Sequence, residues 1–369
     1  MRLTVPVLGD EELQAVREVL ESGYLTQGPK AAEFEAAVLR EVGSDYAFAT
    51  SSCTTALHLA LVALGVGPGD EVVVPDFTFP ATANVVVQQG AVPVVADIDP
   101  STFGMRADSF EQSITGRTKA VIPVHAFGLS ADMDPLMDVA RQHGIPVLED
   151  AACSLGGTYR GRPSGSIGDM GAYSFHPRKI ITTGEGGMLV TNDATLAERL
   201  RVLRSHGSVR GQDYLSFVDA GFNYRLSDVN AAIGVVQMTR LASLLQARRR
   251  NASILTSLLE AVDLVTPPVE PEYAKHTYQS YVVLLDEQID RDGVIARMRE
   301  RGVETTLGTY SLQAQPYFQS LPDAMRHPAE TSGHVHRAAL TLPLHPTQTQ
   351  DELERVAGAL ADVLTPASR

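Results

Sequence analysis

One lysine in this sequence stands in surroundings that suit nucleophilic chemistry. Lys179 follows the apolar stretch Ala172 to Phe175 and lies just before a turn rich in threonine and glycine, Thr182 to Gly187. The chain has only four lysines, and Lys179 alone is flanked by aromatic, hydroxyl and glycine residues. We expect a partly desolvated amine with a lowered pKa, which is what Schiff-base chemistry needs. The alternative is a solvated lysine on a loop, the usual place for this residue.

A second candidate is a run of hydroxyl and thiol residues before a helix. Thr50-Ser51-Ser52-Cys53-Thr54-Thr55 leads into a helix predicted from Ala56 to Leu64. The start of a helix presents free N–H groups and the positive end of the helix dipole, which suits a phosphate. Plain N-capping is the alternative, but one cap explains one such residue and not the whole run. We therefore expect an anion site here.

A carboxylate and two aromatic rings follow the ends of predicted strands. Asp150 ends the apolar strand Pro146 to Asp150, and a bare carboxylate is costly to bury, so it must be paired or lie in a site. Its alternative role is a helix cap. Phe77 and Phe79 follow the strand Glu71 to Pro75. Pyridoxal phosphate needs a lysine, a carboxylate that keeps its ring nitrogen protonated, a phosphate cradle and a face to stack on.

These residues must be positioned by an alternation of strands and helices, a pattern typical of a parallel sheet with helices on both faces. Ligands of such sheets bind beyond the carboxyl ends of the strands, where Asp150, His125 and the Lys179 loop are expected. The predicted strands are Tyr46 to Ala49, Glu71 to Pro75, Val92 to Asp97, Lys119 to His125, Pro146 to Asp150, Ala172 to Phe175 and Met188 to Thr191. The predicted helices are Asp10 to Ser22, Ala31 to Val42, Ala56 to Leu64, Ala81 to Gln89, Pro135 to His143 and Leu196 to Ser205.

Length and pattern favour two domains. The chain has 369 residues, and a single core usually serves about 250–300. A long helix from about Val229 to Leu259 precedes a smaller α+β region. We therefore expect a large domain at residues 1–240 and a small C-terminal domain at residues 241–369. In that region we predict strands at Gln279 to Leu285 and Val303 to Leu307, and helices at Asp290 to Arg301 and Asp351 to Leu364.

Composition restricts the partners and the setting. A net charge of −14 argues against nucleic acid or an anionic membrane as the main partner. The only basic run, Arg248-Arg249-Arg250, is interpreted as a solvated helix face. No apolar run of ~18 residues is present to span a bilayer, and Met1 to Pro6 shows no apolar signal region. Two cysteines, Cys53 and Cys153, cannot form a disulfide framework, so a cytoplasmic setting is predicted. The histidines do not group like metal ligands, so no metal is expected.

Several motifs, taken in order, resemble one family. They are Tyr24 to Pro29, Gly65 to Pro75, Ile122 to His125, Glu149 to Ala152, Ser174 to Gly187 and Gly221 to Ser227. The chain resembles the sugar-nucleotide aminotransferases of the DegT/DnrJ/EryC1/StrS family. The resemblance implies an α/β fold of the aspartate aminotransferase kind (fold type I), with a mainly parallel central sheet in the large domain and a small C-terminal α+β domain.

The resemblance also implies the central catalytic roles. Lys179 would form the Schiff base with pyridoxal phosphate and then move the proton between the substrate carbon and the cofactor. Asp150 would lie on the pyridine nitrogen, and Phe79 would stack on the ring. Pyridoxamine phosphate would be the intermediate form of the cofactor.

Other residues are implied to hold the phosphate. Cys53, Thr54 and Ser174 would contact it from the same chain. Asn223 would reach it from the other subunit, with Arg225 nearby. The active unit implied is a homodimer with shared sites.

Two cysteines depart from the family pattern. Cys53 stands where many members have glycine or alanine, but its backbone N–H can still serve the phosphate. Cys153 stands where many have glutamine or histidine, which puts the usual hydrogen bond to the ring hydroxyl of the cofactor in doubt. Members that dehydrate sugars carry histidine in place of the lysine, so Lys179 argues against that branch.

The resemblance also bears on the substrate. Ser-Phe-His before Lys179, and the Thr-Thr-Gly-Glu-Gly-Gly segment after it, look like enzymes that act at C4 of 4-keto-6-deoxy sugars. His176 is close enough in sequence to touch the sugar or a phosphate oxygen, although it could instead be a packed or capped histidine. We expect transfer of an amino group from L-glutamate to a nucleotide-linked 4-keto-6-deoxyhexose, with TDP, UDP and GDP all open. The alternatives are a C3 sugar or keto-inositol aminotransferase, and a non-catalytic cofactor-binding regulator, against which Lys179 and Asp150 count.

Overall fold

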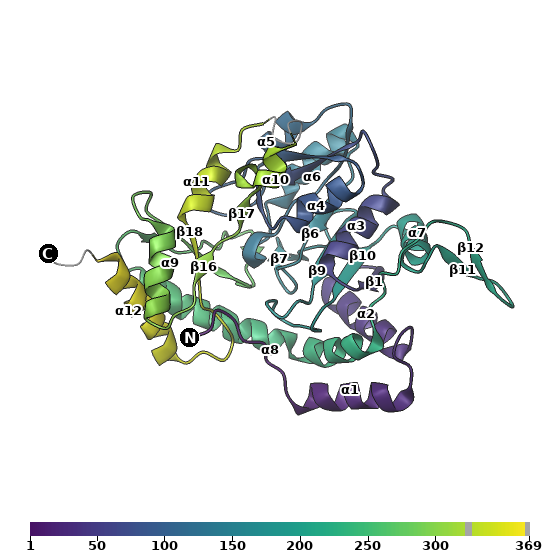
Figure 1. Ribbon diagram of the computed structural model, residues 1–369, viewed down its shortest axis with the longest axis horizontal. Helices are drawn as coiled ribbons and strands as arrows, with labels where there is room; N and C mark the ends of the chain where they lie inside the picture. The colour runs from purple at the N-terminus through teal and green to yellow at the C-terminus, as the bar shows by residue number, and fades with distance from the viewer. Residues whose placement is uncertain (322–326, 366–369) are drawn as a thin grey trace.

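The computed structural model describes residues 1–321 and 327–365 (Figure 1). Its α-helices are α1 (Asp10–Ser22), α2 (Pro29–Val42), α3 (Cys53–Ala63), α4 (Ala81–Gln88), α5 (Ala107–Ser113), α6 (Met133–His143), α7 (Ala194–Arg204), α8 (Asp228–Leu259), α9 (Arg291–Glu300), α10 (Pro316–Gln319), α11 (Glu330–Ala338) and α12 (Gln350–Leu364). The strands up to the middle of the chain are β1 (Tyr46–Thr50), β2 (Glu71–Pro75), β3 (Phe77–Thr78), β4 (Val92–Ala96), β5 (Thr118–Val121), β6 (Leu148–Asp150), β7 (Thr158–Tyr159), β8 (Arg162–Pro163), β9 (Met170–Ser174) and β10 (Gly187–Thr191). The later strands are β11 (Ser208–Arg210), β12 (Leu215–Phe217), β13 (Val265–Thr266), β14 (Ala274–Lys275), β15 (Tyr281–Leu285), β16 (Thr306–Leu307), β17 (Tyr310–Ser311) and β18 (Ala339–Leu342).

The central sheet has the order β1-β10-β9-β6-β5-β2-β4. Two hydrogen-bonded groups, β1-β10-β9-β6 and β4-β2-β5, are joined by parallel bridges from Val121 to Val147 and from Val124 to Asp150. Most neighbours are parallel, as predicted, but β10 runs antiparallel to both β1 and β9. The predicted strand Lys119 to His125 is shorter than expected, because regular pairing stops at Val121.

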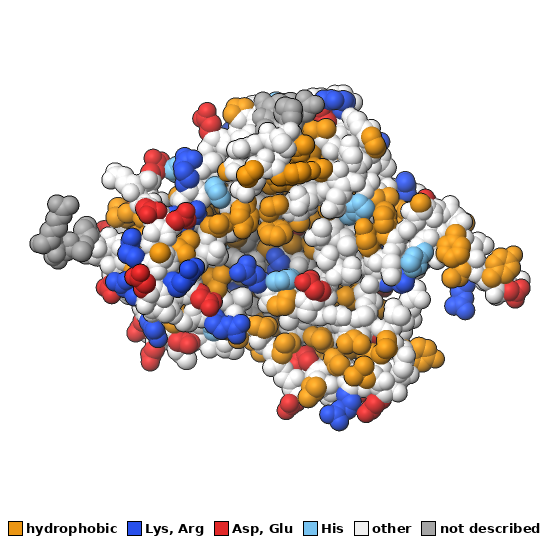
Figure 2. Space-filling view, viewed as in Figure 1, with side chains coloured by type: hydrophobic (Ala, Val, Ile, Leu, Met, Phe, Trp, Pro, Cys, Tyr) orange, Lys and Arg blue, Asp and Glu red, His pale blue; other side chains and the backbone are white. Residues whose placement is uncertain are grey.

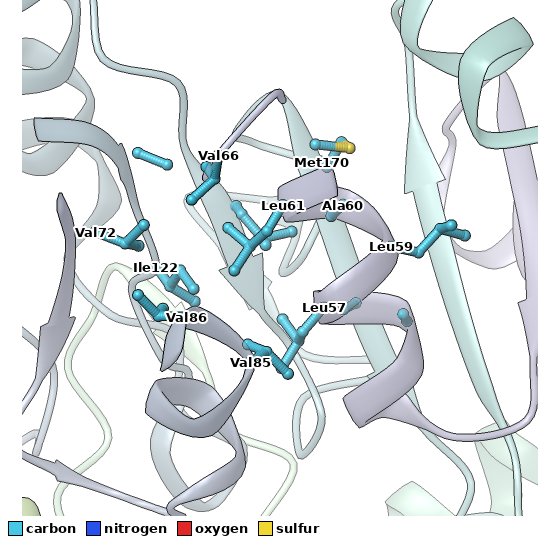
Figure 3. Close-up of a cluster of buried hydrophobic side chains, with 14 of the residues drawn as sticks. Leu57, Leu59, Ala60, Leu61, Val66, Val72, Val85, Val86, Ile122 and Met170 are labelled. Atoms are coloured by element: carbon cyan, nitrogen blue, oxygen red, sulfur yellow. The ribbon is translucent and has the colours of Figure 1, made fainter. Parts of the chain in front are cut away.

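The faces of the sheet are covered by different helices. Successive side chains of a strand point to opposite faces, so strands buried on both faces are apolar throughout, as in the Val72-Val73-Val74 run. Val72 and Val74 pack in a cluster with α3, α4 and α7, while Val73 packs with α5 and α6. Figure 3 shows Leu57 and Leu61 of α3 in the first cluster. On the second face, α2 and α8 cover the β1–β10–β9 side.

A second core surrounds the C-terminal sheet β13-β15-β18-β16, which is antiparallel throughout. The long helix α8 serves both cores: Leu241 and Leu244 pack in the first part of the molecule, and Ala252 and Leu255 pack in the second. The N-terminus lies beside this second core, where Glu304 N donates to the Met1 carbonyl. The division at residues 240 and 241 stays a prediction.

The basic run in α8 was misinterpreted from the sequence. Arg248 is only 2% exposed, and its Nη1 donates to the carbonyl oxygens of Tyr278 (3.0 Å), Gln279 (3.2 Å) and Leu344 (2.7 Å). Burial lowers the pKa of this guanidinium to about 10. Arg248 therefore joins α8 to the C-terminal core. Of the other two arginines in the run, Arg249 is half-exposed and Arg250 is exposed.

Two surface features stand out. The hairpin β11–β12 projects from the body of the molecule (Figure 1), and Figure 2 shows apolar side chains exposed on it. The exposed apolar residues of this hairpin and its flanks are Val209, Tyr214, Leu215, Phe217 and Val218. Exposed apolar residues also occur on α1 and just after it, at Leu13, Leu20, Tyr24 and Leu25. Within residues 1–321 and 327–365, no helix is both long enough and apolar enough to cross a membrane.

Candidate active site

The antiparallel strand β10 explains how the Lys179 loop reaches the site. Gly187, at the start of β10, pairs with Thr50 at the end of β1 and with Ser174 at the end of β9. The loop between β9 and β10 therefore emerges at the edge where β1, β9 and β6 have their carboxyl ends. Asp150 and the start of α3 lie at the same edge, as the sequence predicts for a parallel sheet.

Lys179 is half-buried in a loop that is held at several points. Its backbone N–H donates to the His176 carbonyl at 2.8 Å, and its Nζ lies 3.1 Å from Cys153 Sγ. Asn230 Nδ2 on α8 fixes the loop further by donating to the Thr183 carbonyl at 2.6 Å. The solvated-lysine alternative is therefore excluded, since the amine points into the molecule at Cys153.

The expected direction of the Lys179 pKa was wrong. Burial by itself lowers the pKa, but the nearby Cys153 and Cys53 thiols and the Asp150 carboxylate outweigh it, so the pKa of Lys179 is raised. The sequence-based prediction took into account the burial of Lys179 but not the acidic groups around its amine. In this arrangement the amine is held as an ammonium ion until a group in the site takes its proton.

Asp150 lies at the end of β6 and is 6% exposed. Its Oδ2 accepts a hydrogen bond from Thr82 Oγ1 at 2.8 Å, and its Oδ1 accepts one from the Ala152 N–H at 3.2 Å. Burial raises the pKa of the carboxyl, against the opposing effects of Thr82, Ala152 and Lys179. No helix follows Asp150, so the helix-cap alternative is wrong. The carboxylate has acceptor sites left over for a cationic N–H.

The start of α3 forms a cradle of donors. Ser52 is the N-cap and accepts from the Thr55 N–H at 3.1 Å, while Thr55 Oγ1 accepts from the Ser52 N–H at 3.0 Å. Thr50 Oγ1 donates to the Ser52 carbonyl at 2.9 Å, and Ser51 Oγ lies 3.2 Å from Thr55 Oγ1, so much of the run is bonded locally and the anion site stays a prediction. The helix begins at Cys53, three residues earlier than predicted, which puts Cys53 and Thr54 in its first turn. Their N–H groups point out of the helix end, where an anion binds.

Glycine is required where β10 starts. A Cβ added to Gly187 would lie 2.4 Å from the backbone carbon of Ser52 and 2.5 Å from the Cys53 nitrogen. Only glycine lets β10 pass this close to the start of α3. The close approach brings Ser174, which pairs with Gly187, to the same cradle. Ser174 is half-buried, and its Oγ accepts the His176 N–H at 3.4 Å, so its role at the phosphate stays a prediction.

The two phenylalanines that the sequence grouped together have different surroundings. Phe77 is fully buried and packs against Phe103 and Phe127, so its assignment to the site was wrong. Phe79 is 66% exposed, and its ring centroid lies 6.5 Å from that of Tyr310. β3 ends at Thr78, so Phe79 lies beyond the strand, and its side chain is not held in the core with Phe77. Phe79 is the ring with a free face.

His176 and the Gly221 to Ser227 segment lie around the site. His176 is exposed, and its Nδ1 accepts the Arg178 N–H at 3.2 Å, which is the capped arrangement. Arg225 pairs by its backbone with Thr50 and donates from Nη1 to Ser205 Oγ at 3.0 Å. Asn223 is exposed, and its side chain has no hydrogen-bond partner among the described residues.

Sequence reasoning missed residues that support Asp150. Thr82 lies in the first turn of α4 and carries no mark in the sequence that sets it apart from other threonines. The C-terminal part of the chain also reaches the site, because β17 pairs with β3 and Gln279 Nε2 donates to the Arg178 carbonyl at 2.9 Å. Arg178 and Gln279 line a cavity of about 80 Å³ together with Ser280 and Gly308. These contacts depend on the tertiary fold and leave no local pattern.

The donors and acceptors at this edge fit pyridoxal phosphate. The fit is in their chemistry: a primary amine on the half-buried Lys179, a carboxylate with free acceptor sites on Asp150, N–H groups at the first turn of α3, and the free face of Phe79. When bound, the cofactor supplies a ring that withdraws electrons from the bonds of an attached amine.

The chain is similar to known proteins over nearly its whole length. The sequence profile of the DegT/DnrJ/EryC1/StrS aminotransferase family matches residues 6–361. GDP-perosamine synthase from Caulobacter vibrioides is 41% identical over 366 residues, which cover 98% of each chain. The crystal structure of the aminotransferase TlmJ from Streptoalloteichus hindustanus is similar with a TM-score of 0.93 and 35% identity, over 99% of this chain and 98% of that one.

A further similar structure, Spr1654 from Streptococcus pneumoniae in its pyridoxamine phosphate form, has a TM-score of 0.94 and 29% identity, over 98% of this chain and 97% of the other. The fold is that of the type I aminotransferases, as the sequence predicts. The chain therefore belongs to the DegT/DnrJ/EryC1/StrS aminotransferase family and is a pyridoxal phosphate-dependent aminotransferase.

Proposed function

We propose that the enzyme transfers the amino group of L-glutamate to a nucleotide-linked 4-keto-6-deoxyhexose and yields a 4-amino-4,6-dideoxy sugar nucleotide. The observation that carries the proposal is the convergence of Lys179 and Asp150 at one sheet edge, within a chain similar to GDP-perosamine synthase. The segments on either side of Lys179 add support, since they resemble the corresponding segments of enzymes that act at C4.

Each residue then has a defined task. Lys179 would hold the cofactor through its side-chain amine and would carry a proton to or from the substrate carbon. Asp150 accepts a hydrogen bond from the ring nitrogen and keeps it protonated. Cys53 and Thr54 give backbone N–H groups to the phosphate, Ser174 adds its hydroxyl, and the face of Phe79 covers the ring.

Two neighbours of Lys179 have assigned tasks within the same proposal. Cys153 lies 3.1 Å from the amine, so it contacts the cofactor beside the attachment point. His176 is exposed at the mouth of the site and is placed to touch the hexose or a phosphate oxygen. The small-domain residue Gln279, bonded to the Arg178 carbonyl, closes this side of the mouth.

We also propose that the active unit is a homodimer whose subunits share their sites, in the cytoplasm. Exposed apolar side chains on the β11–β12 hairpin and around α1 give the surface that such an interface needs. The free side chain of Asn223, next to Arg225, would reach the phosphate in the partner subunit.

Mixing two inactive variants tests the shared site. A Lys179→Ala chain and an Asn223→Ala, Arg225→Ala chain are each expected to be inactive. Random exchange makes half of the dimers hybrids with one intact site in two, so up to about a quarter of full activity should return. Absence of recovery, with chain exchange verified by mass spectrometry, would show that each site is built from one chain.

The substrate is tested with a panel of TDP-, UDP- and GDP-linked 4-keto-6-deoxyhexoses, each incubated with L-glutamate. We expect 2-oxoglutarate to form with one of them, and NMR of the product to place nitrogen on C4. Nitrogen on C3, or activity only with a keto-inositol, would overturn the C4 assignment and leave the aminotransferase intact.

A further inference from the structure

Asp150 is supported by two threonine hydroxyls. Thr82 Oγ1 lies 2.8 Å from Asp150 Oδ2, and Thr78 Oγ1 lies 3.1 Å from Thr82 Oγ1. Thr82 is 0% exposed and Thr78 is 2% exposed. The three groups form a continuous chain of hydrogen bonds away from water.

The direction of the protons in this chain follows from the acid at its end. An ionised carboxylate only accepts hydrogen bonds, so Thr82 must use its single O–H proton on Asp150. The oxygen of Thr82 is then an acceptor for the O–H of Thr78. A threonine in a helix commonly donates its O–H to the backbone carbonyl four residues earlier, which for Thr82 is the carbonyl of Thr78. Here its proton goes to the acid instead.

The residue at the far end of this hydrogen-bond chain, Thr78, is held in place by the C-terminal part of the polypeptide. Thr78 is in β3, which pairs with β17 through Tyr310 and Ser311. Asp76, just before β3, accepts hydrogen bonds from Ser311 Oγ at 2.5 Å and from the Gln313 N–H at 2.8 Å. Asp150, at the end of β6, therefore holds the hydroxyl of Thr82, and the pairing of β3 with β17 holds the backbone of Thr78.

We propose that Thr82, aided by Thr78, is a positioning residue that keeps Asp150 ionised and so keeps the proton on the ring nitrogen of the cofactor. This rests on the proposed role of Asp150. A buried carboxylate and a ring nitrogen can share a proton in two ways, as a carboxylate with a protonated ring or as a carboxylic acid with a neutral ring. Hydrogen bonds donated to the carboxylate favour the first arrangement. Without the hydrogen bond from Thr82, the arrangement with a carboxylic acid and a neutral ring becomes more favourable.

The variants that test this are Thr82→Val, which keeps the shape and removes the donor, and Thr82→Ser, which keeps the donor. The direct measurement is the ¹⁵N chemical shift of ring-labelled pyridoxal phosphate bound to each protein. We expect a protonated-ring shift in the wild type and in Thr82→Ser, and a move toward the neutral-ring value in Thr82→Val. The half-reaction with L-glutamate should slow by roughly ten- to a hundred-fold in Thr82→Val.

Asp150→Asn serves as the reference. A wild-type shift and rate in Thr82→Val, beside a neutral ring in Asp150→Asn, would overturn the role of Thr82 and leave that of Asp150 standing. A wild-type shift in Asp150→Asn would overturn the role of Asp150 itself. Should Thr82→Val not fold, Thr78→Val carries the test, because it weakens the same donor and should move the shift in the same direction by a smaller amount. An unchanged shift in Thr78→Val would then overturn the proposal.

Discussion

Two adjacent carboxylates at the end of β6 are both buried but are satisfied very differently. Glu149 accepts four hydrogen bonds: from the N–H groups of Gly165 (2.8 Å), Ile167 and Gly168 (2.6 Å each), and from His125 Nε2 (2.7 Å). Asp150 accepts two, from Thr82 and Ala152. Because side chains alternate along a strand, one acid points into the body of the molecule and the other toward the cofactor edge.

Glu149 and Asp150 differ in the acceptor sites that they leave free. His125 Nδ1 accepts the Ala131 N–H, so its Nε2 carries a proton and donates to Glu149. Glu149 therefore has no acceptor site left for a ligand and fixes the segment at residues 165–168 against the sheet. Asp150 keeps acceptor sites free, and burial raises its pKa. A buried carboxylate with unused acceptor sites is suited to a cationic ligand group.

The largest effect is expected from removing the amine of Lys179, whose Nζ lies 3.1 Å from Cys153 Sγ. Lys179→Ala should abolish turnover and should leave no cofactor fixed to the protein after borohydride reduction. In the wild type, peptide mapping should find the reduced adduct on Lys179. An adduct on Lys119 or Lys275 would show that the site has been placed wrongly.

The next test exchanges the two acids for amides. Asp150→Asn should bind cofactor and lose about 10²–10³-fold of the half-reaction rate, because a neutral amide cannot hold the ring nitrogen protonated. Glu149→Gln should instead lower the free energy of unfolding by about 3 kcal/mol, since its NH₂ group meets backbone donors that are left unpaired.

Unfolding by urea and single-turnover absorbance measurements follow the two quantities separately. The assignment of different roles to the two acids would be wrong if Glu149→Gln lost half-reaction rate at unchanged stability, or if Asp150→Asn turned over like the wild type.

The difference between these two acids also shows what a sequence can predict. The succession of strands and helices, a largely parallel sheet and the edge at which Lys179 and Asp150 lie were predicted from periodicity and the rule for strand ends, and the choice of Phe79 came from the family resemblance. The donors to Asp150 and Glu149 do not, since Thr82 and the 165–168 segment reach them only through the tertiary fold. For the same reason the pKa of Lys179 came out in the wrong direction: its thiol neighbours are distant in sequence.

The buried state of Arg248 was missed for a related reason. Its carbonyl partners, Tyr278, Gln279 and Leu344, lie at least 30 residues away. A run of three arginines on a helix gives no sign of which one faces inward, because the amphipathic pattern of α8 changes as the helix passes from one core to the other.

Asp76 gives an intermediate case, whose effect is on stability. Burial, opposed by the donors Ser311 and Gln313, raises the pKa of Asp76 from 3.8 to about 6. The folded state then binds more protons than the unfolded state between these values, so the contribution of Asp76 is most favourable at pH 4 and declines as the pH rises to 6 and above. The loss is about 3 kcal/mol at most.

Asp76→Asn should remove this dependence. The difference in unfolding free energy between the variant and the wild type, measured in urea from pH 4 to 7, should shift in favour of the variant as the pH rises. A difference that stays constant over this range would mean that Asp76 has an ordinary pKa in the folded protein.

The smallest effect concerns the thiol beside the amine. Cys153 Sγ lies 3.1 Å from Lys179 Nζ, and Cys153 is the main group that raises the pKa of Lys179 against the effect of burial. Removing the thiol in Cys153→Ala should therefore lower that pKa and increase the fraction of neutral amine below it. Since only the neutral amine attacks an aldehyde, the apoprotein variant should attach pyridoxal phosphate faster at pH 8, by up to about ten-fold for each unit of pKa change.

Stopped-flow absorbance at several pH values measures this attachment, and Cys153→Ser is the matched control. Serine keeps a hydrogen-bond acceptor near Lys179 but removes the sulfur, and we expect it to speed attachment as the alanine variant does. If the serine variant behaves like the wild type, the hydrogen bond that Lys179 donates is what holds the amine protonated. If neither variant differs from the wild type, Asp150 and Cys53 determine the state of Lys179, and Asp150 then acts on the amine as well as on the ring.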